Sequence, residues 1–168
     1  MAGRIALYPS EATFLGDLHR FFGHYQPAVE QPTVPGDRET MRRGHALNRF
    51  EGYNNEPDIE TPYAYLYAGR HACCAKVVRA GMRYMFTTGR GGLPGNNDSG
   101  GLTSCYVWNA IGLFPVTGQP LFLIGSPLFD AISLDLGDGT SFHIRAENNS
   151  DENIYVQNAT LNGKVIDR

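Results

Sequence analysis

The chain has 168 residues, a length typical of one domain or of a piece of a larger protein. Its 42% hydrophobic and 18% charged residues are typical of a chain that folds, and they exclude a wholly disordered protein. The 17 Asp and Glu residues outnumber the 14 Lys and Arg residues, so the net charge of -3 excludes a basic field that would hold nucleic acid or anionic lipid. No apolar run approaches the ~18 residues of a membrane span. We therefore expect no nucleic acid and no membrane among the partners of this protein.

The first part of the chain predicts helices separated by proline-rich loops. Apolar residues recur every three or four positions from Ser10 to Tyr25, and Ser10 stands where an N-cap is expected. After a loop with three prolines, Asp37 is placed to cap a second helical segment that reaches about Asn48. Residues 52–62 are polar and contain two prolines, which predicts a loop.

Helical spacing returns at Pro62. A short helix is expected to begin there, and a longer one over residues 71–86 has its apolar residues along one face. Residues 89–101 contain six glycines and a proline, a composition that predicts an irregular loop. This loop is expected to lead into a further helix over residues 102–112, with Phe114-Pro115 as its stop.

Beyond Pro120 the apolar period changes from that of a helix to that of a strand. Gly137-Asp138-Gly139 has the composition of a hairpin turn. We expect an α+β chain, with a helical part over residues 1–118 and a small antiparallel β-sheet over residues 119–168. Because a sheet of four strands cannot shield its own apolar face, it should pack on the helices or on something outside the chain. The four expected strands cover residues 121–124, 131–136, 141–146 and 154–161.

Two loops carry the residues on which chemistry would depend. The first, residues 53–63, holds three carboxylates and two amides within seven residues next to aromatic side chains. Carboxylate and amide oxygens suit Ca²⁺, and the same groups beside an aromatic face suit a sugar. A solvated loop whose acids cap the following helix also explains the composition, and most acidic loops are only surface. The residues alone leave these interpretations open.

The second loop, residues 93–101, has one carboxylate, Asp98, between glycines at the entry to a helix. Asp98 is placed to be the N-cap of that helix. An ionised carboxylate next to a sugar ring also serves as a general base toward water. Sequence spacing does not separate a structural cap from a catalytic base.

Four separated motifs occur in order along the second part of the chain. They are N-N-E-P-D-I-E-T-P-Y at 54–63, G-L-P-G-N-N-D-S-G at 92–100, S-C-Y-V-W-N-A-I-G-L-F-P at 104–115 and I-G-S-P-L-F-D at 124–130. With these motifs the chain resembles the C-terminal third of the family 92 glycoside hydrolases, which are calcium-dependent exo-acting α-mannosidases that work with inversion. The resemblance covers roughly residues 50–168 and extends to the ending at 147–164.

This resemblance implies a fold, a reaction and roles for particular residues. The helices would be part of an (α/α)6 barrel, and the substrate would be a mannose-containing glycan. Asn55 and Glu56 match the motif that ligates the family's active-site Ca²⁺, and Asp98 matches the carboxylate that activates water. We also expect contacts to the sugar, from Glu60, Asn96 and Asn97. A full-length parent of this kind would be periplasmic or secreted.

The departures from the family pattern limit what this chain is expected to do alone. Asn97 stands where the family usually has an acidic residue, and Cys105 stands where an aromatic residue is common. The family's general acid lies in a W-x-Y-T-W-like segment, whereas the only tryptophan here is Trp108. Because inverting hydrolysis needs two carboxyl groups, we expect a C-terminal fragment that is inactive by itself. It would associate with itself or with the missing part of the enzyme. The alternative is a non-catalytic carbohydrate-binding or structural module.

Overall fold

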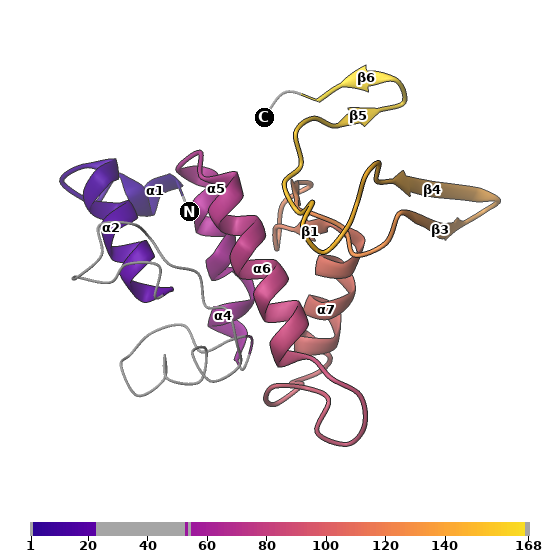
Figure 1. The fold of residues 1–168 in the computed structure, drawn as a ribbon, viewed down its shortest axis with the longest axis horizontal. Helices are drawn as coiled ribbons and strands as arrows, with labels where there is room; N and C mark the ends of the chain where they lie inside the picture. Colours follow the sequence, from indigo (N-terminus) through magenta and orange to yellow (C-terminus); the bar gives the residue numbers. More distant parts are fainter. Residues whose placement is uncertain (1, 23–52, 54, 167–168) are drawn as a thin grey trace.

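The structure is a computed structural model that describes residues 2–22, 53 and 55–166 (Figure 1). The helix predicted over 37–48 lies outside these residues. The described chain begins with a short helix that the sequence did not predict, α1 (Ala2–Ile5), followed by α2 (Glu11–Phe21). Ser10 is the N-cap of α2, as predicted, because its hydroxyl accepts a hydrogen bond from the Thr13 amide at 3.1 Å.

The segment before Pro62 is helical, which corrects the loop predicted there. It forms α4 (Glu56–Glu60). The chain continues as a 3₁₀ turn, η1 (Thr61–Tyr63), and then as α5 (Ala64–Tyr67), which is the short helix predicted to begin at Pro62. A proline stands in the first turn of both α4 and η1, where a backbone N–H has no partner within the helix. The two prolines therefore begin helical turns and do not interrupt them.

Two longer helices lie side by side and are joined by the glycine-rich loop (Figure 1). They are α6 (His71–Met85) and α7 (Gly101–Ile111), close to their predicted bounds. Gly112 ends α7 with φ 82°, and a Cβ at this position would lie 2.7 Å from the Pro127 nitrogen. The left-handed conformation and the close approach both require glycine at that position.

The strands form three separate two-stranded antiparallel ladders within the described residues, which corrects the single four-stranded sheet. Only residues 160–161 of the long strand predicted over 154–161 are paired. The first ladder also crosses residue 118, and the division of the chain at that point stays a prediction. The paired strands are β1 (Leu113–Pro115) with β2 (Phe122–Ile124), β3 (Ala131–Gly137) with β4 (Thr140–Arg145), and β5 (Thr160–Leu161) with β6 (Lys164–Val165).

The hairpin turn predicted between β3 and β4 is confirmed. Asp138 and Gly139 have φ 52° and 73°, the left-handed pair that a two-residue hairpin loop uses. The hairpin extends away from the helices (Figure 1). It carries cross-strand apolar pairs on one face, and none of its residues is fully buried. These pairs are Ile132 with Ile144 and Leu134 with Phe142.

The hydrophobic core lies among the helices, so the α+β class is confirmed with the helices as its packed part. Tyr53 and Tyr65 are completely buried in it. Within the described residues, no helix has the length and apolar character needed to cross a membrane. Other buried members come from α2 (Phe14, Leu15 and Leu18), from α6 (Cys74, Val77 and Met82) and from α7 (Leu102, Cys105 and Ala110).

Candidate active site

The acidic segment presents its oxygen atoms at the start of α4. Asn55 is the N-cap residue, but its side chain makes no capping hydrogen bond. The side chains of Asn55, Glu56 and Glu60 are all exposed. Two acids and an amide are therefore grouped at the surface at and just before one short helix.

The Asp98 turn has a different geometry from the one predicted. Gly100, with φ 94°, is the N-cap of α7, so Asp98 is not the cap. The capping side chain belongs to Asn97, whose Oδ1 accepts hydrogen bonds from the Thr103 amide at 3.0 Å and from the Thr103 hydroxyl at 3.2 Å. Asp98 is exposed and has φ 37°. Its carboxylate is therefore at the surface, and a neighbouring residue performs the structural role.

The two segments lie beside each other because α4 packs against the start of α7. A Cβ at Gly101 would lie 3.7 Å from Ile59 Cδ1, so the first residue of α7 contacts the acidic helix. Asp98 precedes that contact by three residues. The fold therefore brings the Asp98 turn next to the helix that carries Glu56 and Glu60.

A buried polar network fixes the residues that follow α4 to the middle of α7. The Tyr63 hydroxyl donates a hydrogen bond to Asn109 Oδ1 at 2.6 Å, and Asn109 Nδ2 donates to the Cys105 carbonyl at 2.9 Å. Tyr63 also stacks on Phe114, with ring centroids 4.3 Å apart. Tyr63 and Asn109 are 2% and 1% exposed, so this network is sealed from water. Sequence reasoning missed Asn109, although an amide within the apolar run V-W-N-A-I was a visible signal.

Burial keeps the titratable groups in and around this network neutral. It raises the pKa of Tyr63 and of the Cys74 thiol far above neutrality. Burial also raises the pKa of Cys105 to about 12, against the opposing effect of the hydrogen bond from Asn109. None of these groups exchanges a proton near neutral pH. The exposed carboxylates of Asp98, Glu56 and Glu60 are the groups in the two segments that are suited to acid–base or metal chemistry.

The donor atoms of Asn55 and Glu56 fit a calcium ion in kind, because Ca²⁺ prefers amide and carboxylate oxygens. They do not fit it in number, since Ca²⁺ takes 6–8 oxygen ligands. In the part of the chain that the structure describes, no three His, Cys, Asp or Glu side chains form a group that would hold a metal ion. These residues are therefore suited to be part of a calcium ligand shell.

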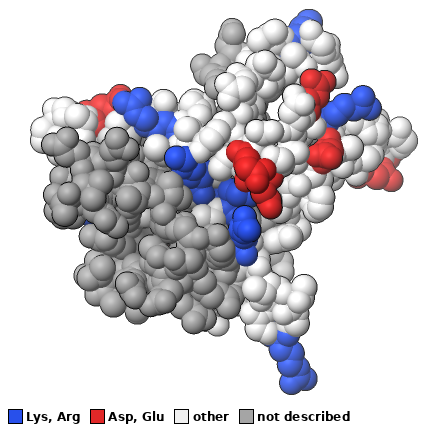
Figure 2. Space-filling model, viewed as in Figure 1, with Lys and Arg blue, Asp and Glu red and all other residues white. Residues whose placement is uncertain are grey.

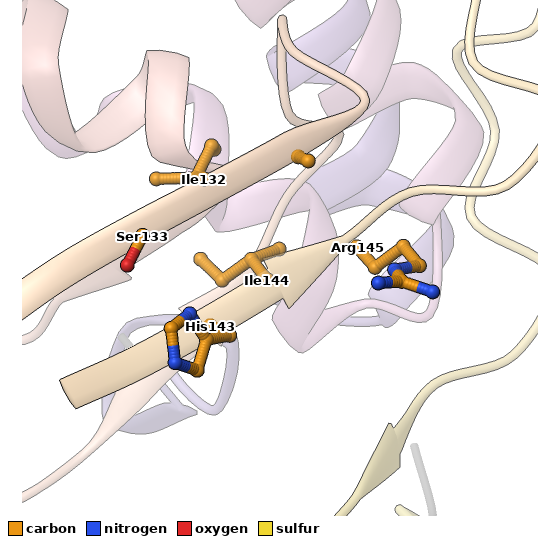
Figure 3. Close-up of a pocket in the computed structure, with 6 residues that line it drawn as sticks. Ile132, Ser133, His143, Ile144 and Arg145 are labelled. Atoms are coloured by element: carbon orange, nitrogen blue, oxygen red, sulfur yellow. The ribbon is translucent and has the colours of Figure 1, made fainter.

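Two hollows of the surface lie away from both segments. One of about 250 Å³ is on the β3–β4 hairpin, beside His143 and Arg145 (Figure 3). The other, of about 460 Å³, lies between α6, β2 and residues 154–159. Neither is lined by any of the six expected site residues. On the face shown in Figure 2, acidic side chains lie next to basic ones. One pair of opposite charge is Arg83 and Asp151, whose charged atoms are 3.9 Å apart.

Comparison with known proteins gives the family of this chain. The sequence model of the glycosyl hydrolase family 92 catalytic domain matches residues 1–168. The chain belongs to glycosyl hydrolase family 92. Among curated proteins, a secreted glycosidase of uncharacterised activity from Arthroderma benhamiae is 39% identical over 117 residues, which are 68% of this chain and 15% of the relative.

Solved structures of a family 92 enzyme have the same fold. The α-mannosidase BT3965 from Bacteroides thetaiotaomicron, in complex with mannoimidazole, matches 94% of this family 92 chain with a TM-score of 0.74 and 27% identity. A second structure of the same enzyme matches 78% of the chain with a TM-score of 0.65 and 30% identity. The chain spans 20% and 19% of the lengths of these two structures.

Proposed function

We propose that these 168 residues are the C-terminal part of an inverting α-mannosidase and that Asp98 is its general base. The observation that carries the proposal is the packing of the first residue of α7, three residues after Asp98, against the acidic helix α4 in a family 92 chain. The relative solved with mannoimidazole is an α-mannosidase, which supports a mannose-containing glycan as the substrate. The secreted relative supports secretion of the parent protein.

Asp98 has the exposure that the role of base requires. In inverting hydrolysis the base takes a proton from water, whose oxygen attacks the anomeric carbon on the face opposite the leaving group. A separate carboxylic acid protonates the departing oxygen, so that the products are the free sugar and an alcohol. The Asp98 carboxylate is exposed, so it is accessible to water.

Ca²⁺ is the proposed cofactor, held in part by Asn55 and Glu56. When bound, the ion would supply positive charge that binds sugar hydroxyls and stabilises negative charge. Glu60 and Asn96 lie on the same two segments and are the proposed sugar contacts, whereas the side-chain oxygen of Asn97, the third expected contact, accepts a hydrogen bond from the Thr103 amide. The exposed side chains of Glu60 and Asn96 are suited to bidentate hydrogen bonds with vicinal hydroxyls.

The described helices would be one part of an (α/α)6 barrel, and the general acid would come from polypeptide outside these residues. The sequence supports this because it has no W-x-Y-T-W-like segment. Exposed apolar side chains on and between the strands also support association, either with the rest of the enzyme or with a second copy. The most exposed of these are Phe122, Phe129, Leu136, Leu161 and Val165.

The experiment is mannose release from an aryl α-mannoside by the complete gene product that contains these residues. Asp98→Asn is expected to lower kcat by about 10²–10⁴-fold, the usual contribution of a general base. Asp138→Asn is the matched control, since Asp138 is also exposed and also has a positive φ, but it lies in the β3–β4 turn.

Unchanged activity of Asp98→Asn would remove Asp98 from the role of base. The 168 residues alone are expected to release no mannose. Calcium-dependent turnover by this chain alone would contradict the proposal that the general acid lies elsewhere.

A further inference from the structure

The residue before Asp98 organises the turn that carries it. The Asn97 backbone carbonyl accepts hydrogen bonds from the amides of Gly100 at 3.0 Å and Gly101 at 2.6 Å. Its side-chain Oδ1 accepts from both the amide and the hydroxyl of Thr103. Two acceptors of one residue therefore close the loop onto the first turn of α7.

This closure holds a backbone that the residues would not adopt by preference. Asp98 and Ser99 have φ 37° and 60°, and Gly100 follows with φ 94°. The left-handed region is uncommon for residues other than glycine, and here two such residues occupy it in succession. Asp98 is exposed, so packing contributes little to its position. The hydrogen bonds of Asn97, together with one of 3.4 Å from the Gly101 amide to the Asp98 carbonyl, hold the backbone of this turn.

We propose that Asn97 is a positioning residue: through Thr103 it holds the left-handed turn that directs the Asp98 carboxylate toward the attacking water. This inference rests on the proposed role of Asp98 as base. It differs from a sugar contact because Asn97 Oδ1 already accepts from the Thr103 amide at 3.0 Å. The Thr103 hydroxyl lies 3.2 Å from the same oxygen and shares its proton with the Gly100 carbonyl, 3.0 Å away. A sugar contact would have to use the amide nitrogen of Asn97.

The chain contains a matched control for this cap. On α2, Ser10 Oγ accepts from the Thr13 amide at 3.1 Å and lies 2.9 Å from the Thr13 hydroxyl. Both caps therefore join a side-chain oxygen to the amide and hydroxyl of a threonine in the first helical turn. The Ser10 cap belongs to a different helix. Ser10→Ala removes the same kind of bond without touching the Asp98 turn.

The experiment measures kcat and KM of the complete gene product with the variants Asn97→Ala, Asn97→Asp and Ser10→Ala. Asn97→Ala is expected to lower kcat by about 10²-fold, the effect of a displacement of about 1 Å at a reacting group. KM should change little, because Asp98 acts on water and contributes little to binding the sugar. Ser10→Ala is expected to lower the melting temperature and leave kcat unchanged.

Asn97→Asp keeps an oxygen in place and is expected to recover most of the lost kcat. The acidic limb of its pH–rate profile should move to higher pH, because two neighbouring carboxylates resist ionising together. Thr103→Val removes the hydroxyl that is shared between Asn97 Oδ1 and the Gly100 carbonyl and keeps the amide donor to Asn97, so it should lower kcat by a smaller factor than Asn97→Ala. This variant tests the inference even if Asn97→Ala does not fold.

Two results would overturn the inference and leave the base role of Asp98 intact. The first is an unchanged kcat in Asn97→Ala and Thr103→Val while Asp98→Asn is inactive. The second is an increase in KM at constant kcat for both Asn97 variants, which would show that Asn97 binds the sugar through its amide nitrogen. An active Asp98→Asn would instead overturn the proposed function itself.

Discussion

The Tyr63–Asn109 hydrogen bond makes a quantitative prediction about stability. Tyr63→Phe removes only the hydroxyl and leaves Asn109 Oδ1 without the donor that now lies 2.6 Å away. Asn109 is 1% exposed, so water does not readily replace that donor. An unsatisfied buried acceptor costs about 1–3 kcal/mol of unfolding free energy. Asn109→Leu removes the other partner and leaves the Tyr63 hydroxyl unpaired at a similar cost.

The double variant should be less destabilised than the sum of the two single variants by about 1–2 kcal/mol, because it removes both polar groups together. The assay is urea unfolding of the 168-residue chain, followed by the fluorescence of Trp108, its single tryptophan. Tyr67→Phe is the control, because the Tyr67 side chain is 36% exposed. Its loss of stability should stay within about 0.5 kcal/mol. Two results would refute the reasoning. One is a loss of unfolding free energy in the double variant that equals the sum of the two single losses, and the other is a Tyr63→Phe variant that is no less stable than Tyr67→Phe.

Three further predictions concern packing, pH and association. Gly81→Ala should destabilise the chain by about 1–2 kcal/mol, because the new Cβ would overlap the Tyr53 ring. This cost should exceed the gain from the better helix propensity of alanine, and an unchanged urea midpoint would contradict the prediction. Burial and the Arg70 guanidinium lower the pKa of His19 from 6.5, so its neutral form stabilises the folded chain above that pH and the gain is lost as the pH falls. The urea midpoint should therefore decrease as the pH is lowered from about 7.5 to 5.5, and the decrease should be smaller in His19→Gln than in the wild type. The 168-residue chain alone should self-associate, as measured by light scattering. Leu134→Asp, on the apolar face of the β3–β4 hairpin, should reduce the self-association, and a monodisperse monomeric wild type would contradict the prediction.

Features that depend on neighbouring residues were predictable from the sequence, whereas those that depend on distant partners were not. The Ser10 cap, the helix α6 and the Asp138-Gly139 turn follow from local spacing and local hydrogen bonds. The strand β1 was missed because the sequence L-F-P becomes a strand only through its pairing with residues 122–124. Residues 154–159 alternate like a strand, but in the described chain they have no ladder partner, so the pattern alone was misleading.

The same distinction applies to the candidate site. Family motifs indicated Asp98, Glu56 and the segment around each of them, because chemistry depends on residue type. The capping role of Asn97 depends on how the turn folds back onto Thr103. From its position in the sequence, the adjacent Asp98 was the candidate for that role, but the N-cap residue is Gly100. Asn109 was hidden for a similar reason, since its partner Tyr63 is 46 residues away in the sequence.

In the proposed site, the residues that would act on the substrate and the residues that fix the backbone are different, and there is a physical reason for this. A base that takes a proton from water must reach solvent, and an exposed carboxylate such as Asp98 gains little fixed position from packing. Its position therefore has to come from the backbone of its turn and from the helix to which the turn is attached. Neutral groups are suited to that work, because a buried amide or phenol costs little once it is hydrogen-bonded, whereas a buried charge is expensive. Asn97 fixes the turn at the surface, and the Tyr63–Asn109 pair fixes α7 to the segment after α4 in the core.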